Sequence, residues 1–262
     1  MPSQPAHRAV TPVALVGAGP GGIDLLTIRA LRLIEAADVV IHDRLVSGDI
    51  LALAHADAHV IAAGKQGFGP TTPQEAINAL ITGHALTGAR VVRLKGGDPV
   101  LFGRLDEEIA ALEDADLPYE IVPGVTAASA AAASIGQSLT QRGRNSGLRL
   151  LTGHDMQGFA DHDWRAMAHP GEVAALYMAK RAARFVQGRL MMHGAAPDTP
   201  VTLVENAARA DERILATTLA DWPTDLADAG LDGPALTFLG LAPREARARI
   251  PQTTPLTRQE LA

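Results

Sequence analysis

The sequence contains no cysteine, and this absence excludes several kinds of site. Disulfide bonds, thiol nucleophiles and cysteine-ligated zinc or iron–sulfur clusters all require that side chain. Any catalysis must therefore rely on carboxylates, lysine, histidine, serine or threonine, or on a bound cofactor.

Aromatic residues and positive charge are also scarce. Aromatic side chains make up 3% of the chain although hydrophobic residues reach 47%, so the core must be built mainly from alanine, valine, leucine and isoleucine. Such a composition is typical of alanine-rich α/β proteins. The formal net charge of −6 argues against nucleic acid or an anionic membrane as a partner, because both favour a basic protein face.

Long hydrophobic runs are missing as well. The first 12 residues lack the apolar core of a signal peptide, and no segment approaches the length that spans a membrane. We therefore expect a soluble cytoplasmic protein with no membrane segment. A length of 262 residues is enough for two domains of ordinary size.

Predicted strands and helices alternate through the first half of the chain. The strands expected there are 13–17, 39–43, 59–63, 91–94 and 119–122, and the helices are 25–37, 50–53, 73–87 and 106–115. This alternation predicts a mostly parallel sheet covered by helices. Ligands of such sheets bind at the carboxyl ends of the strands.

After about Val122 the pattern changes. Helices are expected at 126–135 and 182–194, and strands at 148–152, 173–178, 200–207 and 234–242, with 213–222 as a strand entering a helix. Strands with fewer helices between them indicate a second α/β domain with a mixed sheet. The predicted organisation is an N-terminal tail (1–12), an N-terminal α/β domain (13–122), a C-terminal α/β domain (123–243) and a C-terminal tail (244–262).

Three turns rich in small residues follow predicted strands. The first turn, residues 17–22, contains Gly17, Gly19 and Gly22, which together with Asp43 satisfy the dinucleotide-binding fingerprint. On this pattern alone, a nicotinamide-dependent oxidoreductase is one alternative, and a cofactor-binding module without catalysis is another.

Details of the three turns favour a cofactor without phosphate. Pro20 removes a backbone donor where a pyrophosphate would need one. The second turn, residues 96–99, carries Asp98, which would repel a phosphate but suit a cation or a pair of hydroxyls. The third turn, residues 123–128, opens an alanine-rich helix. Glycine after a strand is also common in ordinary turns, but three such turns indicate a ligand gripped mainly by backbone.

A polar stretch at 152–164 contains side chains that could bind a metal. They are His154, Asp155, Asp161, His162 and Asp163. Their spacing matches no helical pair or known ligand loop, and aspartate and histidine also favour turns, so no metal site is predicted.

An ordered series of motifs resembles the tetrapyrrole methylases. The motifs are VGAGPG at 16–21, HDRLVS at 42–47, GK at 64–65, VVRLKGGDPVLFGR at 91–104, VPGVTAA at 122–128, SLTQR at 138–142, TGH at 152–154, YM at 177–178 and TPVTLVEN at 199–206. The resemblance runs from about Val13 to Leu241, and it is strongest to the members that methylate uroporphyrinogen III.

The resemblance implies a fold and an activity. These family members use S-adenosylmethionine to methylate two ring carbons of uroporphyrinogen III, which gives precorrin-2, the branch point to cobalamin and sirohaem, and S-adenosylhomocysteine. Their fold is two α/β domains with the active site in the cleft between them, and they are usually homodimers. Another precorrin methylase, or a relative that methylates an RNA ribose or a modified histidine, is the alternative within the superfamily.

The matching motifs also imply roles for individual residues. The expected cofactor contacts are Pro20, Gly96, Gly97, Asp98, Leu101, Thr126, Ala127, Met178 and Ala207, the last standing where the family usually has glycine. The expected substrate contacts are Arg104 and Arg142, whose guanidinium groups can bind the substrate's carboxylates in a bidentate manner, and Glu107, which stands where the family has a carboxylate near the macrocycle.

Two further residues match proposed catalytic positions of the family. Asp43 matches the proton acceptor and Lys65 the proton donor. From the residues alone, Asp43 could also be a structural carboxylate that bonds Arg44 or backbone amides, and Lys65 could also be an exposed lysine.

Overall fold

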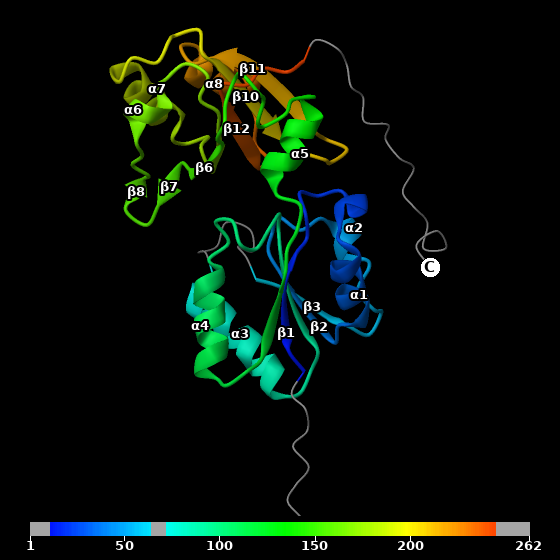
Figure 1. Ribbon diagram of the computed structural model, residues 1–262. Coiled ribbons are helices and arrows are strands. Elements are labelled where there is room, and N and C mark those ends of the chain that lie inside the picture. The colour runs from blue at the N-terminus through cyan, green and yellow to red at the C-terminus, as the bar shows by residue number, and fades with distance from the viewer. Residues whose placement is uncertain (1–10, 64–71, 245–262) are drawn as a thin grey trace, which may run out of the picture. The chain divides into compact units, whose positions relative to one another are not determined.

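The computed structural model describes residues 11–63 and 72–244, and the chain divides into two compact units between Val125 and Thr126. The sequence places this boundary slightly earlier, after Val122. Each unit contains its own sheet with helices packed against it (Figure 1).

The first unit is built on a five-stranded parallel sheet. Its strands are β1 (Val13–Gly17), β2 (Val39–His42), β3 (His59–Ala62), β4 (Val91–Lys95) and β5 (Tyr119–Val122). Their order in the sheet is β3-β2-β4-β1-β5, and every neighbouring pair is parallel. The parallel sheet predicted from the alternation of strands and helices is confirmed.

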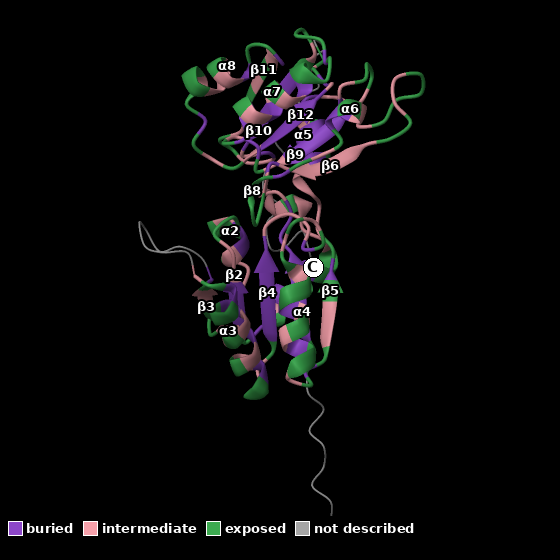
Figure 2. Cartoon of the chain, turned by 90° about the vertical axis from the view of Figure 1, so that its left-hand side faces the viewer, coloured by how far each residue is buried: buried purple, intermediate pink, exposed green. Residues whose placement is uncertain are grey.

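Helices cover both faces of this sheet. They are the 3-10 helix η1 (Ile23–Leu25), α1 (Ile28–Ala36), α2 (Gly48–Leu51), α3 (Gln74–Leu86) and α4 (Leu105–Asp114). Ala14 and Val16 of β1 pack in one cluster with Ile34 of α1, whereas Leu15 packs in a second cluster with Ile81 of α3. Alternate side chains of a strand point to opposite faces, so β1 is buried on both. Figure 2 shows β4 buried along its whole length in the same way.

The first helix begins later than the sequence predicts. α1 starts at Ile28 instead of residue 25, because Thr27 caps it: Thr27 Oγ1 accepts a hydrogen bond from the Ala30 N–H at 3.1 Å. Such a cap satisfies a backbone donor that the first helical turn leaves unpaired. As a result, the first turn leads into the short η1 instead of directly into a long helix.

The second unit is built on a mixed sheet. Its elements are α5 (Ala127–Ser134), β6 (Arg149–Thr152), β7 (His154–Asp155), β8 (Gly158–Phe159), α6 (Trp164–Met167), β9 (Ala174–Tyr177), α7 (Ala183–Met192), β10 (Pro200–Glu205), β11 (Arg213–Thr218), α8 (Trp222–Ala229) and β12 (Ala235–Leu239). The main sheet has the order β11-β10-β12-β9-β6. Only β6 and β9 are parallel in it, and the other neighbours are antiparallel, which confirms the predicted mixed sheet. Trp222 of α8 and Val186 of α7 pack with Leu176 and Leu203 of the sheet.

Three short elements, β7, β8 and α6, are absent from the sequence prediction. They lie in the polar stretch that contains potential metal ligands. Asp155 Oδ1 accepts hydrogen bonds from the N–H groups of Gln157 (2.7 Å) and Gly158 (3.0 Å), and Asp163 Oδ1 accepts one from Ala166 N (3.0 Å). These carboxylates therefore close a hairpin and cap a helix. Within the described residues, no group of three or more acidic or histidine side chains could hold a metal ion.

None of the helices in residues 11–63 and 72–244 is long and apolar enough to cross a bilayer.

Candidate functional site

The first and second turns are joined by backbone hydrogen bonds. The N–H of Ala18 donates to Lys95 O at 2.7 Å, and the N–H of Gly19 donates to Gly97 O at 3.1 Å. The N–H of Gly97 in turn donates a hydrogen bond to Gly19 O at 2.7 Å. The turns at the carboxyl ends of β1 and β4 are thus joined directly, and Pro20 lies at the tip of the first turn between two glycines with positive φ.

The third turn packs against the other two without room for a side chain. A Cβ atom on Gly124 would overlap the carbonyl oxygen of Gly97 and lie 3.0 Å from Gly17 Cα. A Cβ atom on Gly17 would lie 2.6 Å from Gly124 N and 2.7 Å from Gly97 O. Gly17 and Gly124 are therefore required by the contact between backbones. The structure brings together the three turns that the sequence singles out.

The second turn presents backbone to open space. Gly97 has φ of 72°, and nothing lies within 4 Å of the position that its Cβ would take. Asp98 follows it, with Oδ1 accepting a hydrogen bond from Val100 N at 3.2 Å, while the Asp98 carbonyl accepts one from Leu101 N at 3.2 Å. Among the described residues, no partner is found for Asp98 Oδ2. Gly96 is enclosed instead, with Leu45 Cβ 2.7 Å from its Cβ position.

Asp43 lies directly after β2 and is paired with a buried arginine. Arg93 of β4, whose side chain is 2% exposed, donates from Nη2 to Asp43 Oδ1. The same guanidinium donates from Nη1 to the carbonyls of Ile41 (3.4 Å) and Leu94 (3.3 Å) and from Nε to Glu108 Oε1 (2.9 Å). The partner of Asp43 is thus Arg93 and not Arg44, and its own side chain remains 30% exposed.

Glu108 and Lys95 extend this pair into a buried charge cluster of Asp43, Arg93, Lys95 and Glu108. Lys95 Nζ donates to Glu108 Oε1 at 2.8 Å, and the two side chains are 4% and 0% exposed. Burial, and then the positive charge of Arg93, lower the pKa of Lys95. Burial also acts to lower the pKa of Arg93, but the negative charges of Asp43 and Glu108 outweigh it, so the pKa of Arg93 is raised. Glu108 Oε2 is buried and finds no hydrogen-bond partner among the described residues.

Sequence reasoning missed three members of the buried charge cluster. Arg93 and Lys95 alternate with apolar residues in VVRLK, a strand whose every residue is buried. A strand covered by helices on both faces normally consists of apolar residues. The two charged residues within such a strand could therefore have indicated a buried charge cluster. Lys65, the predicted proton donor, lies outside the described residues.

Arg104 and Glu107 bind each other. Arg104 donates from Nε and Nη2 to the two carboxylate oxygens of Glu107 at 2.7 and 2.6 Å, with the side chains 55% and 48% exposed. The hydrogen bond from Arg104 lowers the pKa of Glu107. The geometry is the bidentate fork expected for a carboxylate ligand. A substrate carboxylate would have to displace Glu107 to use it.

Arg142 lies in the loop between α5 and β6. It is exposed, and within residues 11–63 and 72–244 its side chain has no hydrogen-bond or ion-pair partner. The neighbouring side chains of Arg144 and Asn145 bond within the loop, with Arg144 Nη2 donating to Ser138 O at 2.6 Å and Asn145 Nδ2 to Leu139 O at 2.9 Å. These hydrogen bonds stabilise the loop, while the side chain of Arg142 remains accessible to a ligand.

In the second unit, Thr126 and Met178 are brought close by Tyr177. The Tyr177 hydroxyl is hydrogen-bonded to Thr126 Oγ1 and accepts from Ala128 N at 3.3 Å. Met178 is 53% exposed and has φ of 54°, a left-handed conformation that is unfavourable for a side chain of this size. The turn containing Ala127 and the end of β9 are thus neighbours, as a shared ligand would require.

Ala207 lies in a loop whose backbone is held on both sides. Its neighbours Asn206 and Ala208 have φ of 51° and 60°, and Ala207 itself is buried. Glu212 Oε2 accepts hydrogen bonds from Ala208 N (2.8 Å) and Ser134 Oγ (2.7 Å). Hydrogen bonds of Glu212 thus tie this loop to α5.

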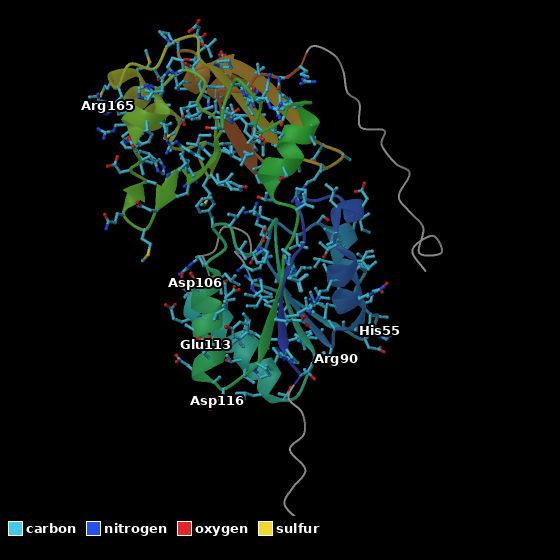
Figure 3. All side chains as sticks on the ribbon, viewed as in Figure 1. His55, Arg90, Asp106, Glu113, Asp116 and Arg165 are labelled. Atoms are coloured by element: carbon cyan, nitrogen blue, oxygen red, sulfur yellow. The ribbon has the colours of Figure 1, made fainter. Side chains whose placement is uncertain are left out.

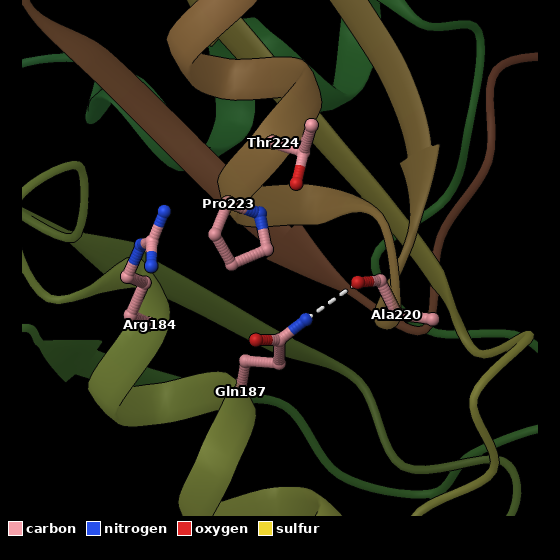
Figure 4. Close-up of a pocket in the computed structure, with 5 residues that line it drawn as sticks. All are labelled: Arg184, Gln187, Ala220, Pro223 and Thr224. Carbon is pink, nitrogen blue, oxygen red and sulfur yellow. Dashed lines mark hydrogen bonds between the residues drawn. The ribbon is translucent and has the colours of Figure 1, made fainter.

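Two other features of the chain lie apart from these residues. Asp38 and Arg90 form an ion pair of 2.6 Å that lowers the pKa of Asp38 to about 2, mainly through the Arg90 side chain. Arg90 precedes β4, and Figure 3 shows it at the opposite end of the first unit from Asp106. A cavity of about 320 Å³ lies between α7 and α8, lined by Arg184, Gln187, Ala220, Pro223 and Thr224 (Figure 4). It contains none of the predicted site residues.

Comparisons with known proteins point to one family. A family model of the tetrapyrrole (corrin/porphyrin) methylases matches residues 12–223. The siroheme synthase of Methylococcus capsulatus is 46% identical over 229 residues, covering 87% of this chain and 48% of the relative. That of Acinetobacter baylyi is 42% identical over 228 residues, covering 87% and 50%. The chain thus spans about half the length of these relatives.

Solved structures of similar fold carry related descriptions. The uroporphyrin-III C-methyl transferase of Thermus thermophilus aligns with a TM-score of 0.73 and 36% identity, covering 87% of this chain and 97% of its own. A complex of the Thermus thermophilus enzyme with S-adenyl homocysteine aligns with a TM-score of 0.73, 37% identity and the same coverage. A cobalt precorrin-4 methyltransferase aligns with a TM-score of 0.78 and 28% identity, covering 87% and 94%.

Proposed function

The chain belongs to the tetrapyrrole methylases, and on that premise we propose that it methylates two ring carbons of uroporphyrinogen III and so forms precorrin-2. Its methyl donor is S-adenosylmethionine, which leaves as S-adenosylhomocysteine. The names of the relatives support a place in the formation of sirohaem or cobalamin.

The observation that carries the proposal is the pairing of the first two turns. In a dinucleotide-binding protein, the N–H groups of the first turn must face the pyrophosphate. Here the N–H groups of Ala18 and Gly19 already donate to the carbonyls of Lys95 and Gly97, and Pro20 has none to offer. The helix α1 begins only at Ile28, away from the turn. This geometry argues against a nicotinamide cofactor and for a ligand without phosphate.

The residues present fit S-adenosylmethionine. Gly97 leaves open space beside its backbone, into which a flat or extended ligand could come close. The carboxylate of Asp98 suits a pair of ribose hydroxyls or a positive charge. When bound, this cofactor supplies an electrophilic methyl group. The contacts that we propose for it are Pro20, Gly96, Gly97, Asp98, Leu101, Thr126, Ala127, Met178 and Ala207.

Asp43 is our proposed proton acceptor. Proton loss from the substrate ring must accompany methylation of a ring carbon, and a carboxylate can accept that proton if it is fixed and reachable. Arg93 holds Asp43 Oδ1, while the side chain remains partly exposed. Lys65 is proposed as the donor that returns a proton.

Arg104 and Arg142 are proposed to bind the carboxylates of the substrate. Arg142 is exposed, and Arg104 can exchange Glu107 for a substrate carboxylate with the same bidentate geometry. Glu107 would then lie beside the macrocycle. We also propose that the protein works as a homodimer, which sedimentation velocity can test.

The reaction itself can be tested by mass measurement. The protein is incubated without oxygen with uroporphyrinogen III and S-adenosylmethionine, and the products are analysed by mass spectrometry. We expect the tetrapyrrole to gain two methyl groups and S-adenosylhomocysteine to accumulate in a 2:1 ratio to it. No gain in mass, together with tight binding of a nicotinamide dinucleotide in calorimetry, would overturn the proposal.

The cofactor site can be tested separately with Asp98→Ala. Loss of a charge-assisted hydrogen bond should weaken S-adenosylhomocysteine binding by about tenfold or more in calorimetry. Asp106→Ala removes an exposed carboxylate from the first turn of α4 and serves as the matched control. Equal affinity of the two variants would remove Asp98 from the site.

A further inference from the structure

The helix α5 is capped by a residue from another element. Thr126 occupies the N-cap position, yet its side chain makes no capping hydrogen bond to its own helix. The N–H of Ala128, in the first turn of α5, donates instead to the Tyr177 hydroxyl at 3.3 Å. N–H groups in the first turn of a helix lack partners within the helix, so Tyr177 supplies the acceptor that Thr126 would ordinarily provide.

The same hydroxyl orients Thr126. It is hydrogen-bonded to Thr126 Oγ1 as well as to Ala128 N, although Tyr177 lies 51 residues from Thr126 in the chain. A tyrosine hydroxyl has one proton and can accept further bonds. Both contacts can therefore form at once, and the start of α5 is tied to the end of β9.

The backbone that follows Tyr177 is fixed as well. Met178 adopts its left-handed conformation with its carbonyl hydrogen-bonded to His154 Nδ1 at 3.0 Å. Gly153 packs beneath it, since a Cβ atom there would lie 2.8 Å from Met178 O and 2.7 Å from Ala179 Cα. The TGH motif thus holds the residue after Tyr177 in place.

We infer that Tyr177 is a positioning residue of the methyl-donor site, which holds Thr126 and Ala127 in register with Met178. The inference rests on the proposed function, because these three residues are cofactor contacts there. Tyr177 couples two of these contacts, because its hydroxyl is hydrogen-bonded to Thr126 and Met178 follows it directly in the chain. Loss of the Tyr177 hydroxyl would leave the Ala128 N–H and the Thr126 hydroxyl without this partner. The turn would then be less ordered before the cofactor binds, and the free energy needed to order it would reduce the affinity.

The test is a set of affinities for S-adenosylhomocysteine, measured by calorimetry on the full chain. Tyr177→Phe keeps the ring and removes the hydroxyl with both of its part-buried hydrogen bonds, and we expect affinity to fall about fivefold to tenfold. The chain has 2 tyrosines, and Tyr119→Phe is the matched control. The Tyr119 hydroxyl bonds Glu113 at 2.9 Å on the surface of the first unit, so its loss should leave affinity unchanged.

A double-mutant cycle separates positioning from general stability. Thr126→Val removes the side-chain partner of Tyr177 and leaves the bond from Ala128 N, and in that background Tyr177→Phe should cost clearly less affinity than it does in the wild type, because coupled residues are not additive. Full additivity, or equal affinity of wild type and Tyr177→Phe, would overturn the inference while leaving the proposed function in place. Failure of the wild type to bind S-adenosylhomocysteine would overturn both.

Discussion

Replacing Glu108 by glutamine perturbs the buried charge cluster at its centre. Glu108 is 0% exposed and its Oε1 accepts hydrogen bonds from Arg93 Nε at 2.9 Å and Lys95 Nζ at 2.8 Å. Glutamine keeps the shape of the side chain and can place its carbonyl oxygen at the same position. Its amide nitrogen would take the place of Oε2, which has no partner among the described residues. The substitution therefore removes charge with little change in packing.

The magnitude follows from charge balance. With all four groups ionised, the cluster carries two positive and two negative charges, and the glutamine variant leaves two buried cations beside Asp43 alone. Removing one partner of a buried ion pair costs about 3–5 kcal/mol. Because the two hydrogen bonds to Oε1 can persist, we expect the lower end, about 3 kcal/mol at pH 7.

The pH dependence has a definite sign. The pKa of Lys95 is already lowered by burial and by Arg93, and Glu108 opposes that shift, so the variant lowers it further. Between the folded pKa of Lys95 and the unfolded value of about 10.4, the unfolded chain binds more protons than the folded one. The free energy of unfolding then rises with pH. The deficit of the variant should shrink as pH rises from neutral towards this unfolded pKa.

Equilibrium unfolding in urea measures this deficit. Circular dichroism is the suitable signal, since the 2 tryptophans, Trp164 and Trp222, both belong to the second unit. Glu107→Gln is the control, because it removes the adjacent but exposed carboxylate and should change stability little. A deficit below about 1 kcal/mol at pH 7, or one that grows with pH, would refute the account of Glu108 as the counter-charge.

Three further results are expected. Gly124→Ala should lower the free energy of unfolding by about 1–3 kcal/mol and weaken S-adenosylhomocysteine binding, because its Cβ would overlap the Gly97 carbonyl. Gly83→Ala is the control, since nothing lies within 4 Å of its Cβ position, and it should neither lower stability nor weaken binding. Thermal melts measure the stability and calorimetry the binding. Asp38→Asn should be less stable than wild type at neutral pH, and the difference should disappear as pH falls from about 4 to about 2. The pKa of Asp38 in the folded protein is about 2, and protonation of its carboxylate removes the ion pair with Arg90. Urea titrations across this pH range test the prediction. Arg142→Ala should raise the KM for uroporphyrinogen III while leaving cofactor affinity unchanged, and equal effects on both would contradict its assignment to the substrate.

Local patterns in the sequence were enough to predict most elements and the first sheet. The apolar runs around Leu15 and Ile41 are short, follow turn residues and alternate with amphipathic helices, and such a pattern leaves few options besides a parallel α/β sheet. The elements β7, β8 and α6 could not be predicted, because they depend on side-chain bonds of Asp155 and Asp163 within a polar stretch. Polar residues of this kind carry no periodicity.

For the candidate site, residue types alone were enough to single out the three turns and the chemistry that they can serve. Gly17, Gly97 and Gly124 are small, and Asp98 is acidic, whatever lies around them. The folded chain was needed to see that the turns pack against one another, that the N–H groups of Ala18, Gly19 and Gly97 are already used, and that Arg93 holds Asp43. Hydrogen-bond partners and charge compensation depend on distances between strands that are far apart in the chain, and no local pattern encodes those distances.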